Sequence, residues 1–308
     1  MRYTLRQIEI FVAVARDENV SRAAAALNLS QSATSAALAE LELQFDQPLF
    51  DRHARRLRLN GQGRLLLPLA VELLDRAEEV EALLRGERVP GELRVGATLT
   101  IGNYLLPLIV AGFMQRHPQS RVRLQVHNTV TIASQLLHYE IDLGLIEGEV
   151  QDPDLESEGW IEDELVVFCA PGHALAGREA VSLEELAAQP WILRERGSGT
   201  RETLERAFRH GPGGVVARLE LEHTEAVKRA VESGLGLGCI SRLALRDAFR
   251  RGSLVPVPAP ELALQRRFSF VWHRGKYHTV AMRRFLEDCR AFTAGARRSD
   301  QIPLPPVP

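Results

Sequence analysis

Two turns in the sequence carry hydroxyl side chains that could bind an anion. Thr98 and Thr100 follow the strand-like run LRVGA, and Ser198 and Thr200 precede the helical run RETLERAF. Backbone N–H groups at the start of a helix are unpaired and favour negative charge, and Ser and Thr add further donors. One such turn alone is better explained as an ordinary helix cap. The anion hypothesis therefore depends on the two turns lying together.

A second group of residues could contact DNA. Leu38, Leu41 and Phe45 recur at helical spacing, and we expect them to face inward on a helix that Ser30 caps. The outward face would then carry short polar or methyl side chains and one amide, namely Gln31, Ser32, Ser35 and Ala36. Gln can bridge an adenine, Ser can contact a base or a phosphate, and an Ala methyl can pack on a thymine methyl. This pattern predicts a recognition helix in the major groove.

Positive charge follows this helix. The sequence has no Lys or Arg between Asn28 and Phe45, but four arginines come soon after, Arg52, Arg55, Arg56 and Arg58. An isolated run of this kind is usually a solvated surface, whereas beside a helix-turn-helix it favours contact with phosphates. Such contacts release counterions, so the affinity for DNA would fall as salt rises.

The spacing of apolar residues indicates how the chain is divided. Three helical runs precede Pro48, with Ser21 as the expected cap of the second, and a basic strand-like wing follows. A long apolar helix comes next, and then strand-like runs alternate with helices, which is typical of an α/β domain. We expect a winged helix-turn-helix at 1–60, a linker and dimerisation helix at 61–88, an α/β domain at 89–296 and a proline-rich, extended or unstructured tail at 297–308. The alternative for the long helix is that it packs only on its own domain.

Composition limits the class of protein. The chain has 308 residues, 45% of them hydrophobic, and at roughly 150 residues per domain this predicts about two folded domains. The net charge of −2 does not decide for or against DNA, because the local distribution of charge matters. Cys169, Cys239 and Cys289 are too far apart for a CxxC pair and are expected in the core. Charges interrupt the apolar residues near the amino terminus, so we expect no signal peptide, no membrane contact and a cytoplasmic location.

Common catalytic motifs are missing from the sequence. The GSGT turn is not G-x-S-x-G, GLGLG lacks the spacing of a nucleotide-binding loop, and the chain has no HExxH. The histidines are scattered, and each is better explained as a surface or hydrogen-bonded residue. The sequence therefore predicts no enzyme, no cofactor and no metal site. Turnover of a bound small molecule would contradict this prediction.

The segment from Leu5 to Gly63 contains a family pattern, F..VA......S.AA..L..SQSA.S..L..LE followed by PLF.R. This segment resembles the amino-terminal domain of LysR-type transcriptional regulators. Later runs resemble the effector domain of the same family, namely VGATLTIGNYLLP, DLGLIEG, RERGSGTR and TEAVKRAVESGLGLG. The resemblance therefore spans nearly the whole chain, and it is strongest to regulators of sulphur assimilation and carbon fixation.

The resemblance implies a periplasmic-binding-protein-like α/β effector domain with two lobes, lobe I at about 91–161 and 267–296 and lobe II at about 165–264. It places a small-molecule effector, with a small anion or carboxylate favoured, between the lobes. The implied pocket residues are Thr98, Thr100, Ile101 through its backbone N–H, Asn128, Thr129, Glu147, Ser198 and Thr200. The carboxylate of Glu147 would repel an anion, but it could hold an amine or hydroxyl or point away. Arg194, Arg196 and Arg201 could supply counter-charge.

The resemblance also implies partners. They are double-stranded DNA with a dyad-symmetric operator, a second copy of the chain in a homodimer, a homotetramer built from two kinds of dimer, and RNA polymerase. An effector would change the angle or spacing of the DNA-binding domains through the linker helices. The remaining alternative is an architectural DNA-binding protein without an effector, which would leave the large α/β domain without a role.

Overall fold

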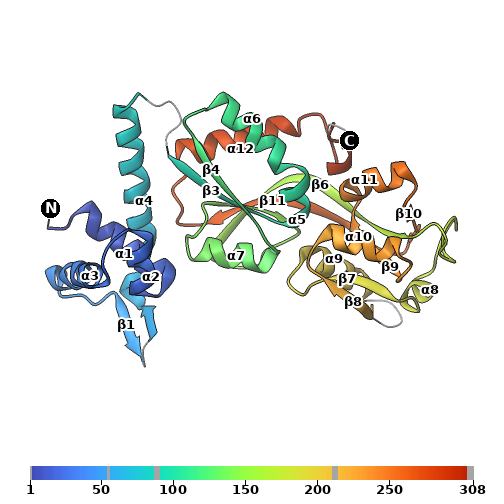
Figure 1. The fold of residues 1–308 in the computed structure, drawn as a ribbon, viewed down its shortest axis with the longest axis horizontal. Helices are drawn as coiled ribbons and strands as arrows, with labels where there is room; N and C mark the ends of the chain where they lie inside the picture. Colours follow the sequence, from blue (N-terminus) through green and yellow to red (C-terminus); the bar gives the residue numbers. More distant parts are fainter. Residues whose placement is uncertain (1, 54–55, 87–90, 210–213, 304–308) are drawn as a thin grey trace.

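The chain forms a small helical domain, one long helix and a two-lobed α/β domain (Figure 1). The computed structural model describes residues 2–53, 56–86, 91–209 and 214–303. The long helix lies between the helical domain and the first lobe, and the second lobe extends away from both (Figure 1). The fold class predicted from the sequence is confirmed.

Three helices form the core of the amino-terminal domain. They are α1 (Leu5–Asp17), α2 (Val20–Ala26) and α3 (Gln31–Phe45). Ser30 caps α3 as expected, because its hydroxyl accepts a backbone N–H at 3.1 Å. Ser21 does not cap α2: the side-chain oxygen of Asn19 accepts the first free N–H groups of that helix. Asn and Ser both cap well, and the helix starts two residues earlier than expected.

A wing and the long helix complete this half of the chain. Strand β1 (Phe50–His53) pairs antiparallel with β2 (Arg56–Leu59). Helix α4 (Gly61–Leu84) follows, and the side-chain oxygen of Asn60 accepts the N–H of Gly63 at 2.9 Å. Leu67 and Val71 are buried against the helical domain. Apolar burial on this face therefore holds α4 on the three helices.

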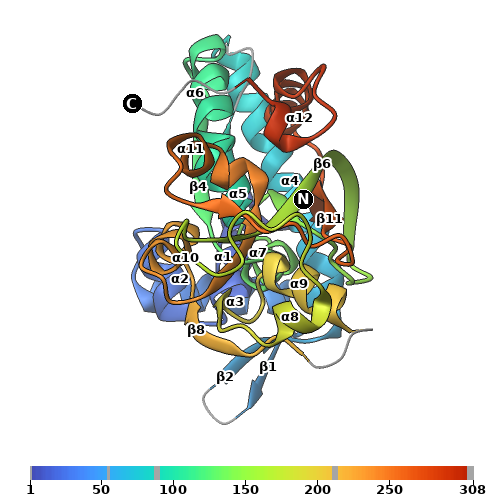
Figure 2. The same cartoon turned by 90° about the vertical axis from the view of Figure 1, so that its right-hand side faces the viewer.

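Among the described residues, nine strands form one sheet in the order β4-β3-β5-β11-β6-β9-β7-β8, with β10 paired to β6. Lobe I contains β3 (Glu92–Ala97), β4 (Arg121–Val126), β5 (Leu143–Glu147), α5 (Leu99–Tyr104), α6 (Leu106–Arg116), α7 (Thr129–Leu137) and α12 (Val280–Phe292). Lobe II contains β7 (Trp191–Arg194), β8 (Ala217–Leu221), β9 (Leu237–Ser241), β10 (Val255–Pro256), α8 (Leu183–Ala187), α9 (Gly199–Phe208), α10 (Thr224–Glu232) and α11 (Arg242–Arg251). Figure 2 shows the lobe II helices from the far end of the molecule.

Two strands connect the lobes. β6 (Leu155–Cys169) pairs antiparallel with β11 (Gln265–His273) as far as Glu164, and from Leu165 onward it pairs with β9. The chain therefore crosses between the lobes at Glu164 and returns at Gln265, next to Leu264, whose carbonyl accepts the N–H of Leu165 at 3.0 Å. Hinge movement between the lobes would be concentrated at these crossing points.

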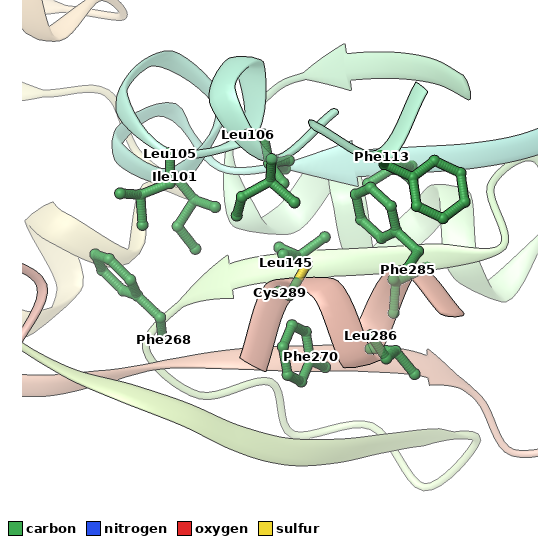
Figure 3. Close-up of a cluster of buried hydrophobic side chains, with 14 of the residues drawn as sticks. Ile101, Leu105, Leu106, Phe113, Leu145, Phe268, Phe270, Phe285, Leu286 and Cys289 are labelled. Carbon is green, nitrogen blue, oxygen red and sulfur yellow. The ribbon is translucent and has the colours of Figure 1, made fainter. Parts of the chain in front are cut away.

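Each lobe has its own core. In lobe I, Phe113 of α6 and Phe285 of α12 meet edge to face with ring centroids 5.3 Å apart (Figure 3). Figure 1 shows α6 and α12 on one face of the lobe I sheet and α7 on the other. In lobe II, Trp191 is fully buried and packs edge to face on Phe208 at 5.8 Å. Separate cores favour movement of the lobes as units.

The carboxyl-terminal segment differs from the expectation. Ser299–Gln301 form a 3-10 helix, and Ile302 is 1% exposed in the lobe I core. The interpretation of 297–308 as an extended or unstructured tail is therefore wrong for these residues. That interpretation rested on the prolines, which start at Pro303, and gave no weight to the apolar side chain before them. Residues 304–308 lie outside the described part of the chain.

Candidate functional site

The two hydroxyl turns meet where lobe I faces lobe II. Thr98 is the N-cap residue of α5, and Ser198 is the N-cap residue of α9. The start of α9 lies so close to the end of β5 that a Cβ atom on Gly199 would be 2.1 Å from the carbonyl oxygen of Glu147. Only glycine allows this contact without a shift of the backbone. The four hydroxyl residues Thr98, Thr100, Ser198 and Thr200 are all buried, so the predicted anion site is closed.

The carboxylate of Glu147 lies at the centre of this closed site. Its Oε1 accepts the backbone N–H of Thr100 at 2.5 Å, and its Oε2 accepts the hydroxyl of Thr200 at 3.2 Å. Nη2 of Arg266 forms an ion pair with Oε2 at 2.9 Å. Among the orientations that the sequence left open, Glu147 points inward. It therefore takes two of the donors that were expected to hold an anionic effector, the N–H of Thr100 and the hydroxyl of Thr200.

Arg266 is the central cation, and the sequence analysis missed it. Its side chain is fully buried, Nε donates to Asp163 Oδ2 at 2.7 Å, and Nη1 donates to Thr200 Oγ1 at 2.9 Å. Strand alternation could have found it, because Arg266 shares the buried face of β11 with Phe268 and Phe270. A buried Arg on an apolar strand face requires a partner, and this requirement points to a functional cluster.

The pKa values of the two carboxylates of this cluster shift in opposite directions. Burial alone would raise the pKa of Glu147, but Arg266, Arg194 and the contacts with Thr100 lower it below its ordinary value. For Asp163, burial raises the pKa even though Arg266 and the neighbouring hydroxyl groups act in the opposite direction. The guanidinium of Arg266 therefore lies at ion-pair distance from two buried carboxylates, so the cluster has one more acidic group than cations.

A cavity of about 600 Å³ lies beside the closed site. Ser198 and Thr129 line it, and Thr129 Oγ1 is buried without a hydrogen-bond partner in the described part of the chain. Asn128 is the N-cap residue of α7, and its side-chain oxygen accepts a backbone N–H at 3.0 Å. The rest of the rim carries charges of both signs, from Arg196, Arg201, Arg206, Glu149, Glu202 and Glu205. A polar molecule could enter here and reach the site between the lobes.

Two of the arginines expected as counter-charge have carboxylate partners. Arg194 Nε lies 2.8 Å from Glu195, and Arg201 Nε lies 2.7 Å from Glu205. Arg196 and Arg201 both line the cavity. Ile101, expected to offer its backbone N–H, buries its side chain in the lobe I core. The structure thus brings the hydroxyl turns, Glu147 and Thr129 to one region, with Arg266 as the cation.

The expected recognition face lies on the exposed side of α3. Gln31, Ser32 and Ala36 are exposed and Ser35 is half-buried, while Leu38 and Leu41 are buried. Phe45, expected to face inward, is 48% exposed and tilts toward Tyr3 with ring centroids 6.3 Å apart. That expectation is wrong because Phe45 is the last residue of α3 and extends beyond the three-helix core.

The arginines of the wing are placed only in part. Arg52 lies in β1, opposite Leu57, and Arg56 lies in β2, opposite His53. Arg58 of β2 is exposed. Arg55 lies outside the described residues, so its position carries no argument. The wing is the next element after α3 in the chain.

Helix α4 has a second apolar face, which is exposed in the described part of the chain. Leu65 is 69% exposed and Leu69 is 64% exposed, whereas Leu67 and Val71 of the same helix are buried. With Phe45 and Leu41 they line an apolar groove of about 600 Å³. One face of the helix therefore packs on its own domain. The other is exposed in the described part of the chain, and its role in dimerisation stays a prediction.

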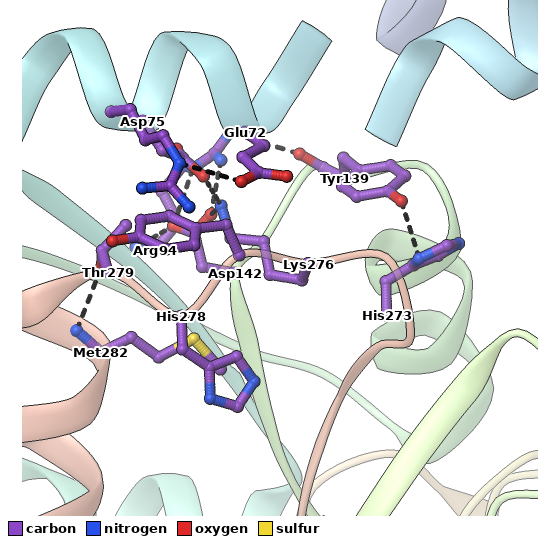
Figure 4. Close-up of polar contacts among 12 residues, drawn as sticks. Glu72, Asp75, Arg94, Tyr139, Asp142, His273, Lys276, His278, Thr279 and Met282 are labelled. Carbon is purple, nitrogen blue, oxygen red and sulfur yellow. Dashed lines mark hydrogen bonds and ion pairs between the residues drawn. The ribbon is translucent and has the colours of Figure 1, made fainter. Parts of the chain in front are cut away.

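The long helix docks on lobe I through buried charges (Figure 4). Lys276 Nζ lies 2.6 Å from Asp75 Oδ2 of α4 and 2.9 Å from Asp142 Oδ1 of lobe I. Arg94 Nη2 pairs with Asp142 Oδ1 at 2.7 Å. Burial and the charge of Arg94 lower the pKa of Arg16, from the helical domain, to about 10. We call Asp75, Arg94, Asp142 and Lys276 the junction cluster.

Hydrogen bonds beside the junction cluster fix the angle of docking. Glu79 of α4 accepts the N–H of Val280 at 2.7 Å, at the start of α12, where a negative charge is favoured. The same carboxylate accepts the hydroxyl of Tyr277 at 3.1 Å. Within lobe I, the hydroxyl of Tyr139 lies 2.7 Å from Nδ1 of His273, and Tyr139 packs in the apolar cluster of the helical domain. Helix α4 and lobe I therefore share specific polar contacts.

Comparison with known proteins identifies the class. Residues 5–64 match the family described as "Bacterial regulatory helix-turn-helix protein, lysR family", and residues 86–294 match "LysR substrate binding domain". The chain belongs to the LysR family of transcriptional regulators. Within the described residues, no helix is long and apolar enough to cross a membrane, and no group of His, Cys, Asp and Glu side chains is arranged to hold a metal ion.

The relatives are named as regulators and not as enzymes. The chain is 45% identical over 290 residues to the uncharacterized HTH-type transcriptional regulator YeiE of Escherichia coli (strain K12), covering 94% of this chain and 98% of the relative. It is 33% identical over 289 residues to the RuBisCO operon transcriptional regulator of Allochromatium vinosum, covering 93% and 95%. The Synechocystis CcmR regulatory domain in complex with 2-PG superposes with a TM-score of 0.63 and 30% identity, covering 67% and 99%. The branch expected from the sequence is thus confirmed.

Proposed function

We propose that this regulator is switched by a small anion or carboxylate that binds between the lobes, at the start of α5 and α9. One observation carries the proposal. The carboxylate of Glu147 is held by the N–H of Thr100, the hydroxyl of Thr200 and the guanidinium of Arg266. These groups form a complete receptor for an anion, filled by the protein's own side chain.

An anionic effector would compete with Glu147 for these donors. Entry through the cavity beside Thr129 and Ser198 would bring it to the same place. Removal of Glu147 from Arg266 changes the contacts between β5 of lobe I and α9 of lobe II, so the effector would favour a different lobe arrangement. A ligand shifts such an equilibrium only by its differential affinity for the two states. The 2-PG bound by the CcmR regulatory domain supports a small-molecule effector in this domain.

The proposed DNA contacts combine base readout with phosphate binding. Gln31, Ser32, Ser35 and Ala36 would read base edges, and Arg52, Arg55, Arg56 and Arg58 would neutralise phosphates. The apolar groove along Leu65 and Leu69 would take the same face of a second copy, which gives a homodimer on a dyad-symmetric operator. We extend the proposal to a homotetramer and to RNA polymerase as the partner at the promoter.

The first experiment is a thermal-shift titration of the full chain with sulfate, sulfite, phosphate and short carboxylates. A ligand that binds only the native state at a hundredfold excess over its Kd stabilises it by about 2.7 kcal/mol. We expect the melting temperature of the wild type to rise to a plateau with increasing anion, and we expect Thr200→Ala to abolish this rise. Thr203→Ala is the matched control, since Thr203 is equally buried on α9 but donates to its own helix, to the carbonyl of Gly199 at 2.8 Å. If none of these anions raises the melting temperature of the wild type, the effector is neutral or larger, or the domain is a scaffold.

DNA binding is tested separately by titrations at several salt concentrations. Arg58→Ala should weaken binding to all sequences alike and reduce the slope of log affinity against log salt by about one per subunit. Gln31→Ala should instead change the preference at one base pair by about 1–3 kcal/mol. A loss of sequence preference in Arg58→Ala with an unchanged salt slope would overturn the division of roles.

A further inference from the structure

The segment Ser299–Ile302 connects the two lobes at the hinge, beside the two crossing strands. The side chain of Ile302 is buried in the lobe I core, while its carbonyl oxygen accepts Nη1 of Arg246 at 2.8 Å. Arg246 belongs to α11 of lobe II. Next to this contact, Arg298 Nη1 lies 3.2 Å from Glu164, the residue at which β6 crosses between the lobes. We call Ser299–Ile302 the carboxyl-terminal strap.

The strap reaches the effector site through one carboxylate. Ser299 is fully buried, and its hydroxyl donates to Asp163 Oδ1 at 2.5 Å. The hydroxyl of Ser241, from the end of β9, donates to the same oxygen at 2.6 Å. The other oxygen of Asp163 accepts Nε of Arg266 at 2.7 Å. Asp163 alone therefore lies between Ser299 and Arg266, one of the proposed effector donors.

We infer that Ser299 is a positioning residue of the effector site and that the strap couples the position of Arg266 to the closure of the lobes. This inference rests on the proposed function. Two hydroxyl donors on one oxygen fix the plane of the Asp163 carboxylate, and that plane orients the guanidinium that pairs with Glu147. One donor comes from lobe II and the other from the strap, so Arg266 is held correctly only while strap and lobes are together.

The first test measures anion affinity by calorimetry on the full chain, with sulfate, sulfite, phosphate and acetate as probes. Ser299→Ala should weaken the binding of the anion that binds the wild type by about tenfold, because a hydrogen bond to a charged group is lost behind Arg266. Ser253→Ala is the matched control. It removes a serine that donates to a carboxylate at 2.8 Å, Glu232, between the ends of α10 and α11, and its affinity should equal that of the wild type.

The pH profile of binding separates a positioning role from a structural one. The hydroxyl of Ser299 lowers the pKa of Asp163 against the effect of burial. Loss of this hydrogen bond should raise that pKa further, so the pH dependence of anion affinity should move to higher pH in Ser299→Ala and stay in place in Ser253→Ala. A Ser299→Ala protein with wild-type affinity and a wild-type pH profile would overturn the positioning role.

A second measurement does not depend on the anion. Spin labels on Gln119→Cys in lobe I and Glu222→Cys in lobe II report the distance between the lobes, since both positions are exposed and the native cysteines are buried. Ser299→Ala and a chain ending at Arg298 should broaden the distance distribution, whereas a chain ending at Pro303 should match the wild type. Unchanged distance distributions would overturn the inference that the strap couples the two lobes. If distributions broaden but no anion binds the wild type, the strap stands and the proposed effector class fails.

Discussion

Two clusters of buried charge lie at opposite ends of the same strands, and they differ in balance. In the junction cluster, Asp75 and Asp142 face two cations, Lys276 and Arg94, at 2.6–2.9 Å. In the proposed effector site, the carboxylates of Glu147 and Asp163 face the single guanidinium of Arg266 at 2.9 and 2.7 Å. Each buried charge has a high desolvation cost, which only close partners offset.

The difference suggests a division of labour. A balanced cluster loses stability whichever member is removed, so it favours one arrangement of the DNA-binding half on lobe I. A cluster with a surplus carboxylate can exchange one of its members for an external anion at lower cost. On the proposed function, the junction fixes the architecture and the site around Arg266 responds to ligand.

Three strands join the clusters. β5 starts directly after Asp142 and ends at Glu147, and β3 contains Arg94 and ends just before Thr98. β11 carries Arg266 near one end and finishes three residues before Lys276. A shift of the strand ends in the cleft would thus reach the junction through continuous backbone. Such proximity alone does not prove coupling, which has to be measured.

The largest expected effect comes from breaking the balanced cluster. Lys276→Ala should lower the free energy of unfolding by about 3 kcal/mol, because it leaves two buried carboxylates with one cation fewer. Urea denaturation of the full chain measures it. Lys228→Ala is the control: Lys228 is 8% exposed, but its partner Glu225 is 62% exposed, so the loss should stay below about 1 kcal/mol. Equal losses would contradict the special role of the junction.

Acid should affect the two clusters in opposite directions. Burial alone would raise the pKa of Asp142, but Lys276 and Arg94 lower it well below its ordinary 3.8. A lowered carboxyl pKa gives stability above 3.8 that is lost as the pH falls toward the folded-state value, and Asp142→Asn should remove that loss. The raised pKa of Asp163 has the other sign, so its part of the stability falls as the pH rises above 3.8. Asp163→Asn should remove this fall, and identical pH profiles for the two variants would refute the comparison.

The surplus carboxylate of the cleft predicts a gain of affinity. Glu147→Gln keeps an acceptor for the N–H of Thr100 but removes the charge that competes for Arg266, so anion affinity should rise by about tenfold. Calorimetry with the anion found in the thermal-shift titration measures it, and Glu149→Gln at the cavity rim is the control. If Glu147→Gln instead loses binding, Glu147 holds the effector directly, as an acceptor for a hydroxyl or amine.

Local patterns in the sequence predict one part of this picture well. Helical spacing indicated the three-helix domain and the long helix, and the hydroxyl turns were found because Thr98 and Ser198 each stand directly before a helix. Phe45 shows the limit of periodicity. Spacing alone does not tell where a helix extends beyond the core on which it packs.

The charge clusters depend on contacts that spacing does not encode. Lys276 meets Asp75 from 201 positions away along the chain, and Arg266 meets Glu147 and Asp163 only because β11 lies between β5 and β6 in the sheet. The role of the strap could not be predicted for the same reason, because Ser299 contacts Asp163, which is 136 positions away along the chain. Strand alternation could have indicated that Arg266 is buried, but its partners follow from strand order, which the sequence does not give.

The smallest expected effect tests whether the clusters are coupled. Asp75→Asn weakens the ion pair between α4 and Lys276 in the junction cluster. This cluster lies at the opposite ends of β5 and β11 from the proposed effector site, and Asp75 contacts no residue of that site. If the strands transmit the position of α4, anion affinity should change by about threefold, in the lower part of the range found for coupled sites. Glu72→Gln is the matched control, since Glu72 lies on the same helix and pairs with Arg76 of that helix. Linkage requires the reciprocal effect, so the anion should change the unfolding free energy of Asp75→Asn differently from that of Glu72→Gln. Equal affinities in all three proteins would mean that the junction fixes the fold without sensing the effector, and that the signal to DNA leaves the cleft by another route.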